Sequence, residues 1–413
     1  MGTNNYPVPS TGSSTSTVLP VNASSVILDG SLTSAGTYTT TVNGNGGPAY
    51  LVASVNPATI TISGTAYTVL TGNVVPSKSF GASTSVTVAV LAAPAIFNSS
   101  VMPNNSSWYC VGYGLIGATN YYVALATSTT TGAYSTDGKT WSTLTMPSNT
   151  YYGITFGNSR FMAVGYNDSL TSGIAAYSTN GTTWTASTPA STNVLFNSVA
   201  YGLISATNYY VAIGTIYTTF INTYNGNYST NGTSWSSFNL PSSQYWNEIT
   251  FGNGKFVAVT SNTADGAYST NGTTWTASTM PSASGCTSIA YGLVGSTPTY
   301  VAVSSGQTVG AYSTDGISWT TNTMPSSSAW TAVTYGNGYF VAVAFNTTAG
   351  AYSTNGTTWT ASTMPSSSYW QGVTYGNGYF VAVQQSGTSA GAYFSSGNLP
   401  VNFGIYASSK TVN

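Results

Sequence analysis

The strongest constraint on this chain is a repeat that runs through most of its length. The pattern Tyr-Ser-Thr-(Asp/Asn)-Gly-x-(Ser/Thr)-Trp occurs six times, and its tyrosines are 43, 51, 40, 44 and 40 residues apart. A degenerate seventh copy places Tyr393 41 residues after Tyr352. A period of this length is typical of a β-propeller blade, which cannot bury its apolar faces alone and must stack on its neighbours. The repeat therefore predicts an all-β fold, a seven-bladed β-propeller.

Each repeat has the pattern of four short strands. In the sixth, residues 331–336 alternate apolar and small side chains, and Asn337-Gly338 suits the positive φ angles of a type I′ turn. The apolar run 339–345 indicates a second, buried strand. Residues 350–354 give the third strand, and 357–365 give the outermost one.

The seventh repeat lacks an outer strand, and the segment before the first repeat supplies a candidate for it. Residues 95–108 align with 358–370, with Phe97 at the position of Trp359 and Pro103 at that of Pro365. We expect residues 94–103 to complete the last blade by strand exchange. This closure would leave no open sheet edge.

Four segments follow from this assignment. Residues 1–16 are rich in Ser, Thr, Asn and Pro and are expected to be flexible or ordered only by a partner. Residues 17–93 carry short β-rich runs and predict a small β-sandwich or barrel, which either anchors and oligomerises the chain or only caps the ring. Residues 94–400 form the ring. The tail 401–413 either adds a strand or packs beneath the last blade.

Charge is nearly absent from the sequence. Asp, Glu, Lys and Arg make up 3% of 413 residues, and the net charge is −1. Nucleic-acid binding is not expected, because no basic surface can form. No apolar run is long enough to insert into a membrane. Cys110 and Cys286 fall in distant repeats and are not expected to pair.

The residue types also argue against catalysis, cofactors and metals. The chain contains no histidine and a single arginine, Arg160. Glycosidases need two carboxylates at one bond, but Asp137 and Asp315 occupy turns in separate repeats. Glu248 lies near the expected channel with no second carboxylate beside it. We therefore expect a protein that is not an enzyme, without a cofactor or a metal site.

The repeated motif resembles the Asp-box of sialidases and other BNR-type propellers. Ser135, Asp137, Gly138, Thr140 and Trp141 match that box in kind, although the spacing from Ser to Trp is one residue shorter. The resemblance implies a structural turn, not an active site. The turn residues at the acidic position are Asp137, Asn180, Asn231, Asn271, Asp315 and Asn355.

Two sets of aromatic residues are the candidate ligand-binding site. The first set stands where the first strand of each repeat begins; its members are Trp108, Tyr151, Phe196, Trp246, Trp330 and Trp370. The second, Tyr217, Phe220 and Tyr224, lies in a long loop of the third repeat. Exposed aromatic rings bind sugars and fill interface pockets. The alternative for the first set is that it plugs the channel as core.

Together these features favour a virion surface protein, a fibre, spike or tail-tip subunit that displays the propeller for host-surface or glycan binding. The charge-poor, Ser/Thr/Gly/Asn/Tyr-rich style resembles phage tail-fibre and receptor-binding proteins. Expected partners are other virion proteins through residues 1–93, a host glycan or protein, and further copies of the chain, as a trimer. Two alternatives stay open: a virion decoration subunit without a receptor role, and a secreted or cell-surface bacterial lectin or matrix protein.

Overall fold

The structure is a computed structural model, and it divides the chain into two compact units. One consists of Met1–Ala95 with Gly397–Asn413, and the other of Ile96–Ser396. In the first unit the structure describes only the strands. In the second it describes residues 97–396 apart from 149, 168, 191–193, 217–224, 243 and 282–284.

The first unit contains two five-stranded sheets. Their orders are β1-β3-β36-β5-β8 and β2-β4-β9-β6-β7. The strands are β1 (Asn4–Pro7), β2 (Thr15–Val18), β3 (Ser25–Ser31), β4 (Gly36–Asn43), β5 (Pro48–Ala53), β6 (Ala58–Ile62), β7 (Thr65–Val69), β8 (Val74–Ser79), β9 (Thr84–Val90) and β36 (Asn402–Ser408). Segment 1–16 contains β1 and the start of β2. The tail 401–413 adds a strand, which was one of its two expected placements, and this strand, β36, pairs with β3 and β5.

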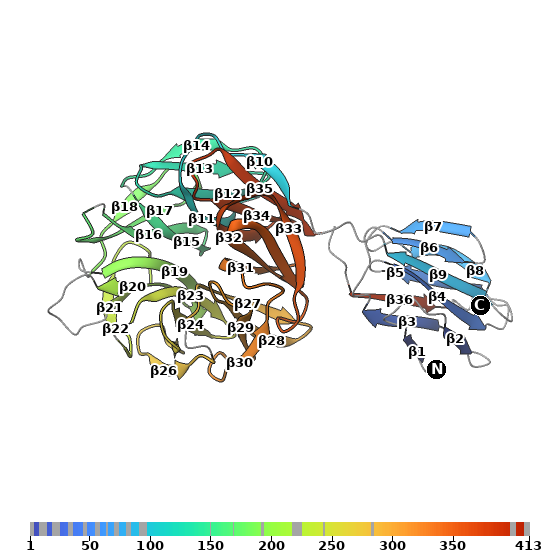
Figure 1. Cartoon of the computed structure of the whole chain (residues 1–413). Coiled ribbons are helices and arrows are strands. Elements are labelled where there is room, and N and C mark those ends of the chain that lie inside the picture. The colour runs from blue at the N-terminus through green and yellow to red at the C-terminus, as the bar shows by residue number, and fades with distance from the viewer. Residues whose placement is uncertain are drawn as a thin grey trace. The chain divides into compact units, whose positions relative to one another are not determined.

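The second unit is a β-propeller, and the first strand of each repeat lies nearest the centre of the ring (Figure 1). Repeats one to five each form a four-stranded antiparallel sheet. Their strands are β11 (Trp108–Ile116), β12 (Thr119–Ala126), β13 (Thr131–Ser135), β14 (Ser142–Thr145); β15 (Tyr151–Gly157), β16 (Arg160–Tyr166), β17 (Gly173–Ser178), β18 (Thr185–Ser187); β19 (Val194–Ile204), β20 (Thr207–Ile216), β21 (Asn225–Ser229), β22 (Ser236–Asn239); β23 (Trp246–Gly252), β24 (Lys255–Thr260), β25 (Asp265–Ser269), β26 (Thr276–Thr279); and β27 (Ser288–Val294), β28 (Thr297–Val303), β29 (Val309–Ser313), β30 (Thr320–Thr323).

The prediction of seven separate blades is wrong, because the ring has six hydrogen-bonded sheets. Repeats six and seven share one six-stranded sheet of order β10-β35-β34-β33-β32-β31. Its strands are β10 (Asn98–Val101), β31 (Ala329–Gly336), β32 (Tyr339–Ser353), β33 (Thr360–Gly376), β34 (Tyr379–Gln384) and β35 (Ala390–Ser395).

The merger has a local cause in the two long strands. β32 continues through the segment that is a loop in other repeats, and β33 runs from the outer edge of repeat six into the inner strand of repeat seven. The Phe345 and Tyr369 rings stack at 4.4 Å, and these two residues are also paired in the ladder. Pairing therefore persists from one repeat into the next.

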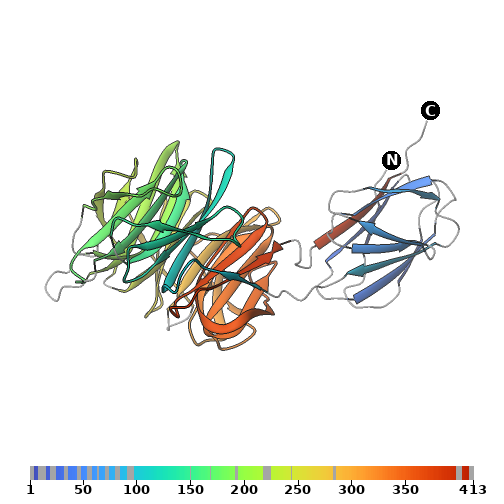
Figure 2. The same cartoon turned by 90° about the horizontal axis from the view of Figure 1, so that it is seen from above.

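β10 lies at the outer edge of this six-stranded sheet. It pairs antiparallel with β35, with Asn98 opposite Tyr393 and Val101 opposite Ala390. The ring closes because a strand from its N-terminal side is paired with a strand from its C-terminal side, as Figure 2 also shows.

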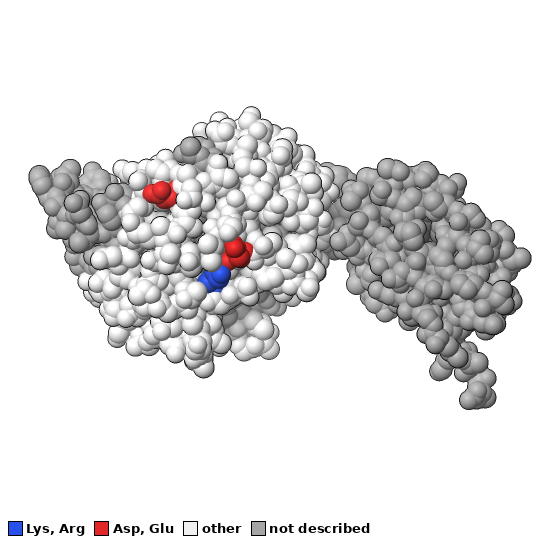
Figure 3. All heavy atoms as spheres, turned by 90° about the horizontal axis from the view of Figure 1, so that it is seen from below, with Lys and Arg blue, Asp and Glu red and all other residues white. Residues whose placement is uncertain are grey.

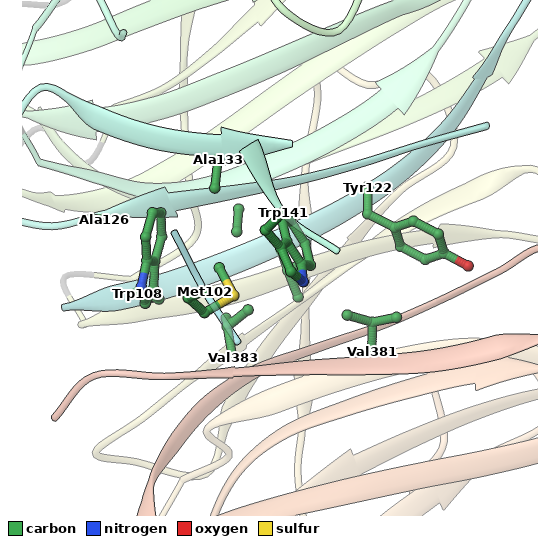
Figure 4. Close-up of a cluster of buried hydrophobic side chains, with 10 residues drawn as sticks. Met102, Trp108, Tyr122, Ala126, Ala133, Trp141, Val381 and Val383 are labelled. Atoms are coloured by element: carbon green, nitrogen blue, oxygen red, sulfur yellow. The ribbon is translucent and has the colours of Figure 1, made fainter. Parts of the chain in front are cut away.

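Buried clusters between neighbouring repeats hold the ring together. In the cluster of Figure 4, Trp108 and Trp141 of the first repeat pack with Met102 and with Val381 and Val383 of the seventh. Trp108 and Val383 are both 0% exposed. Since fully burying one such side chain contributes about 1.5–3 kcal/mol, packing contributes strongly to the stability of this joint.

A second set of contacts joins the inner strands. Each inner strand has a glycine at its last or third-last position, against which an aromatic ring of the next repeat packs. A Cβ on Gly336 would lie 1.9 Å from the ring of Tyr375, and one on Gly376 would lie 2.1 Å from that of Tyr113. No side chain fits in that space, so glycine is required by close packing at these positions.

The six motif turns share one hydrogen-bond pattern. In the first, Ser135 Oγ accepts from Gly138 N at 2.8 Å, and Asp137 Oδ1 accepts from the backbone N–H of Lys139 and of Thr140, both at 2.8 Å. In the sixth, Asn355 Oδ1 accepts from Thr357 N and Thr358 N at 2.9 Å. A carbonyl or carboxylate oxygen serves equally, which explains why Asp and Asn alternate here.

Candidate functional site

The central channel contains a cavity of about 500 Å³ lined by the inner strand of every repeat. Most of these strands carry a β-bulge near their start, for example between Trp108 and Cys110 and between Trp246 and Glu248. A bulge inserts one extra residue and changes the direction of its side chain. The residue after each large buried side chain therefore lines the channel.

These residues form what we call the channel belt, one from each repeat: Tyr109, Tyr152, Asn197, Asn247, Thr287, Thr331 and Gln371. All are half-buried. On repeats three to six, each donates a hydrogen bond to a backbone carbonyl of the next repeat: Asn197 to Trp246 at 2.9 Å, Asn247 to Thr287 at 2.5 Å, Thr287 to Trp330 at 2.6 Å and Thr331 to Trp370 at 2.7 Å.

Tyrosine rings complete the belt on repeats one and two. The side chains of Gln371 and Tyr109 are hydrogen-bonded, and Tyr109 meets Tyr152 edge to face at 4.7 Å. Tyr152 stacks in turn on Tyr166 at 4.5 Å. Burial raises the pKa of Tyr109 to about 12. The belt therefore combines amide and hydroxyl groups on one side with an aromatic patch on the other.

Glu248 lies directly after Asn247 and is the acidic residue among those that line the cavity. Its Oε1 accepts a hydrogen bond from Ser198 Oγ at 2.8 Å. Burial raises the pKa of Glu248 to about 7, although the bond from Ser198 acts in the opposite direction. Burial is the main cause of the raised pKa of Cys110, and the charge of Glu248 raises that pKa further.

Beyond the belt, the inner strands contribute aliphatic residues, threonines and aromatic residues to the lining. Aliphatic side chains such as Ile249 and Val333 come next along the inner strands, followed by rings such as Tyr113 and Phe251. Tyr201 Oη donates to Asn208 Oδ1 at 2.5 Å.

The six aromatic residues predicted as a binding surface are buried instead. The exposed fraction of each is 0 or 1%: Trp108, Tyr151, Phe196, Trp246, Trp330 and Trp370. They precede the bulges and face the neighbouring sheets, so they are packing residues. The other predicted set, Tyr217, Phe220 and Tyr224, lies outside the described residues. The channel belt was not among the predicted site residues, although six of its seven members directly follow one of the six predicted aromatic residues; the seventh, Thr287, follows Cys286.

Charged groups are sparse elsewhere on the propeller, and Figure 3 shows one face made almost wholly of uncharged residues. The described residues include no group of three or more His, Cys, Asp or Glu side chains that could hold a metal ion. Cys110 and Cys286 are free thiols. Within the described part of the chain, no helix has the length and apolar character that crossing a membrane would require.

Fold and channel together define the chain as a repeat-built β-propeller, and solved structures with this fold are similar to it. Streptogramin B lyase matches with a TM-score of 0.60 at 12% identity, covering 72% of this chain and 97% of that one. Virginiamycin B lyase from Staphylococcus aureus matches with a TM-score of 0.60 at 12% identity, covering 72% and 99%. No family model matches the sequence, and no curated protein does.

These likenesses correct one expectation. The prediction that the chain is not an enzyme does not stand, because the structures that share its fold include lyases. At 12% identity the likeness extends to the architecture alone. The chemistry of this chain depends on the residues of its own channel.

Proposed function

We propose that this protein is displayed on a virion surface and that its propeller binds a glycan at the channel mouth. The observation that carries the binding role is the channel belt. Its amide and hydroxyl groups face a cavity of about 500 Å³ beside the Tyr109–Tyr152 pair. Sugars present hydroxyl groups for hydrogen bonding and C–H patches for stacking, and a small number of convergent polar groups beside aromatic rings suits both.

Charge supports a glycan over other ligands. The cavity is lined by one acidic residue, Glu248, and its lining includes no Lys or Arg. A phosphate or polyanionic ligand would find no cationic partner there. An uncharged or weakly cationic polyhydroxylated ligand fits this lining best.

Glycan binding is tested with the full chain on an array of oligosaccharides, followed by titration of the best ligand. Tyr109→Ala removes one ring of the aromatic patch and is expected to weaken binding on the order of tenfold. Leu203→Ala is the matched control, since Leu203 is 53% exposed at the far end of β19. Equal affinity of both variants and wild type would exclude the channel mouth.

Display on a virion rests on composition and on the unit that precedes the ring. Only 3% of residues are charged, and the two five-stranded sheets are available for docking or trimerisation. Immunogold electron microscopy of the source culture tests this setting. Gold on virus particles supports the assignment as a fibre, spike or tail-tip subunit. If no glycan binds, the same labelling supports a decoration subunit. Gold on cell envelopes with bare particles would leave an exported lectin.

A second candidate is an acid–base reaction on the bound ligand, favoured by Glu248. A carboxyl group with a pKa of about 7 can take or give a proton at neutral pH. A catalytically inactive histidine-to-alanine variant of virginiamycin B lyase, solved with quinupristin, matches at a TM-score of 0.59 and 11% identity. This chain has no histidine, so Glu248 would have to serve alone. Mass spectrometry of incubated oligosaccharides tests it: product that depends on Glu248 supports the reaction.

A further inference from the structure

The belt near Glu248 has two side-chain amides whose nitrogen atoms donate to backbone carbonyls. Asn197 Nδ2 donates to the Trp246 carbonyl and Asn247 Nδ2 to the Thr287 carbonyl. A carbonyl oxygen can only accept, so these bonds fix both amide orientations. Each Oδ1 is then the free end of its side chain, and no described residue donates to either one.

Glu248 adds a third acceptor at the same level of the channel. Ser198, on the neighbouring strand β19, donates its only hydroxyl hydrogen to Oε1. The Ser198 oxygen itself accepts from Ile249 N at 3.4 Å. No described residue donates to Oε2. Strands β19 and β23 thus bring three oxygen acceptors to one side of the mouth.

The Glu248 carboxylate also has no positive partner within the cavity. The other titratable groups that line the same cavity are Tyr201 on β19, Tyr291 on β27, Tyr335 on β31, Tyr152 on β15, and Tyr109, Cys110 and Tyr113 on β11. None of these carries a positive charge. An enclosed carboxylate without a partner is unfavourable, and a cationic ligand group would relieve this.

We propose that this corner of the mouth binds a primary ammonium group, and that the ligand is an amino sugar with a free amine. A primary ammonium has three donors, matching the acceptors on Asn197, Asn247 and Glu248. The rings of Tyr109 and Tyr152 supply faces for a cation or for the sugar ring. The ammonium part stands on these contacts, and the sugar part rests on the proposed glycan function.

A divalent cation suits the same oxygens less well. Ca²⁺ takes about six to eight oxygen ligands, usually several of them carboxylates. Here a single carboxylate carries one negative charge, which a monovalent ammonium balances. The test must therefore distinguish binding of calcium from binding of the amine.

Glu248 is the only glutamate in the chain, so its carboxyl can be observed directly. In protein labelled with ¹³C at the glutamate Cδ, one signal reports its titration. Propylammonium and glucosamine are the probes, with propanol and N-acetylglucosamine as matched controls. Propylammonium stays protonated to about pH 10, as a lysine does. An ion pair favours the charged carboxylate, so both amines should lower the Glu248 pKa and neither control should.

Titration calorimetry then compares a glucosamine tetramer with its N-acetylated form at pH 7. Glu248→Gln should weaken the amino tetramer by at least about tenfold and leave the acetylated one unchanged. Asp265→Asn is the matched control, since it removes one charge from the same repeat at a residue that does not line the cavity.

The outcomes separate the two proposals. An unmoved Glu248 signal with propylammonium overturns the ammonium site, and so does a shift with CaCl₂ alone. A shift with propylammonium but no binding of any sugar retains the ammonium site and overturns both the amino-sugar assignment and the glycan function. Equal affinity for the amino and acetylated tetramers keeps the glycan function and overturns the amine preference.

Discussion

Two rings of side chains circle the propeller one residue apart, and they differ in almost every property. The packing ring, Trp108, Tyr151, Phe196, Trp246, Trp330 and Trp370, is buried between sheets. The channel belt follows it by one residue and lines the cavity. A β-bulge separates them, because its extra residue turns the next side chain away from the core. Large, fully buried side chains therefore mark the packing side of these strands, and half-buried side chains with polar atoms, including those of Tyr109 and Tyr152, mark the channel side.

The largest effect on stability is expected for Trp330, a packing-ring residue whose neighbour on β31, Thr331, belongs to the channel belt. Trp330→Ala removes a ring that is 0% exposed and whose Nε1 donates to Ser326 O at 3.1 Å. We expect the free energy of unfolding to fall by about 3–5 kcal/mol. Thr331→Ala, in the belt, should cost about 0.5–1.5 kcal/mol through its hydrogen bond to Trp370 O. Urea denaturation followed by tryptophan fluorescence measures both, and equal losses would contradict the division between the rings.

Gly376 and Gly378 require glycine for different reasons: the first has no space for a side chain, and the second has a positive φ. A Cβ on Gly376 would lie 2.1 Å from the Tyr113 ring, whereas one on Gly378 would meet nothing within 4 Å at a φ of 83°. Gly376→Ala should cost about 1–3 kcal/mol or more by overpacking. Gly378→Ala should cost about 1 kcal/mol, because the left-handed region disfavours a side chain. Thermal unfolding of the two variants checks the order, and the reverse order would count against the ring-to-glycine contacts.

The sequence predicted the parts of this fold that depend on local pattern. The repeat defined the propeller, and Asn337 and Gly338 have the positive φ angles that the predicted type I′ turn requires. The merger of repeats six and seven could not be predicted, because it depends on pairing between Phe345 and Tyr369, which are far from each other in sequence. The belt was missed for a related reason: a bulge is a mismatch between two strands, and neither strand shows it alone.

Glu248 gives the belt a pH dependence that the packing ring lacks. Its pKa in the folded chain, about 7, lies above the unfolded value of about 4.3. The folded state therefore binds more protons between these values, and stability falls as pH rises through about 4.3 to 7. Each unit of raised pKa corresponds to at most about 1.4 kcal/mol, and partial exposure reduces this. Glu248→Gln should flatten the unfolding free energy across that range. A slope unchanged from wild type would contradict the raised pKa.

Asp137 offers the opposite case outside the channel, and the smallest expected effect. Partial burial alone would raise its pKa, but hydrogen bonds from the backbone of Thr140 and Lys139 and from Ser135 lower it overall. A lowered pKa stabilises the fold above the unfolded value of about 3.9, and this contribution is lost as pH falls through the folded pKa.

The substitution Asp137→Asn should leave the free energy of unfolding nearly unchanged at pH 7, because Asn355 makes the same turn bonds. It should also remove part of the acid sensitivity below about pH 4. Acid titration of both proteins by circular dichroism measures this. If Asp137→Asn instead lost stability at pH 7, the charge rather than the acceptor oxygen would hold the turn, and the alternation of Asp and Asn among the repeats would need another explanation.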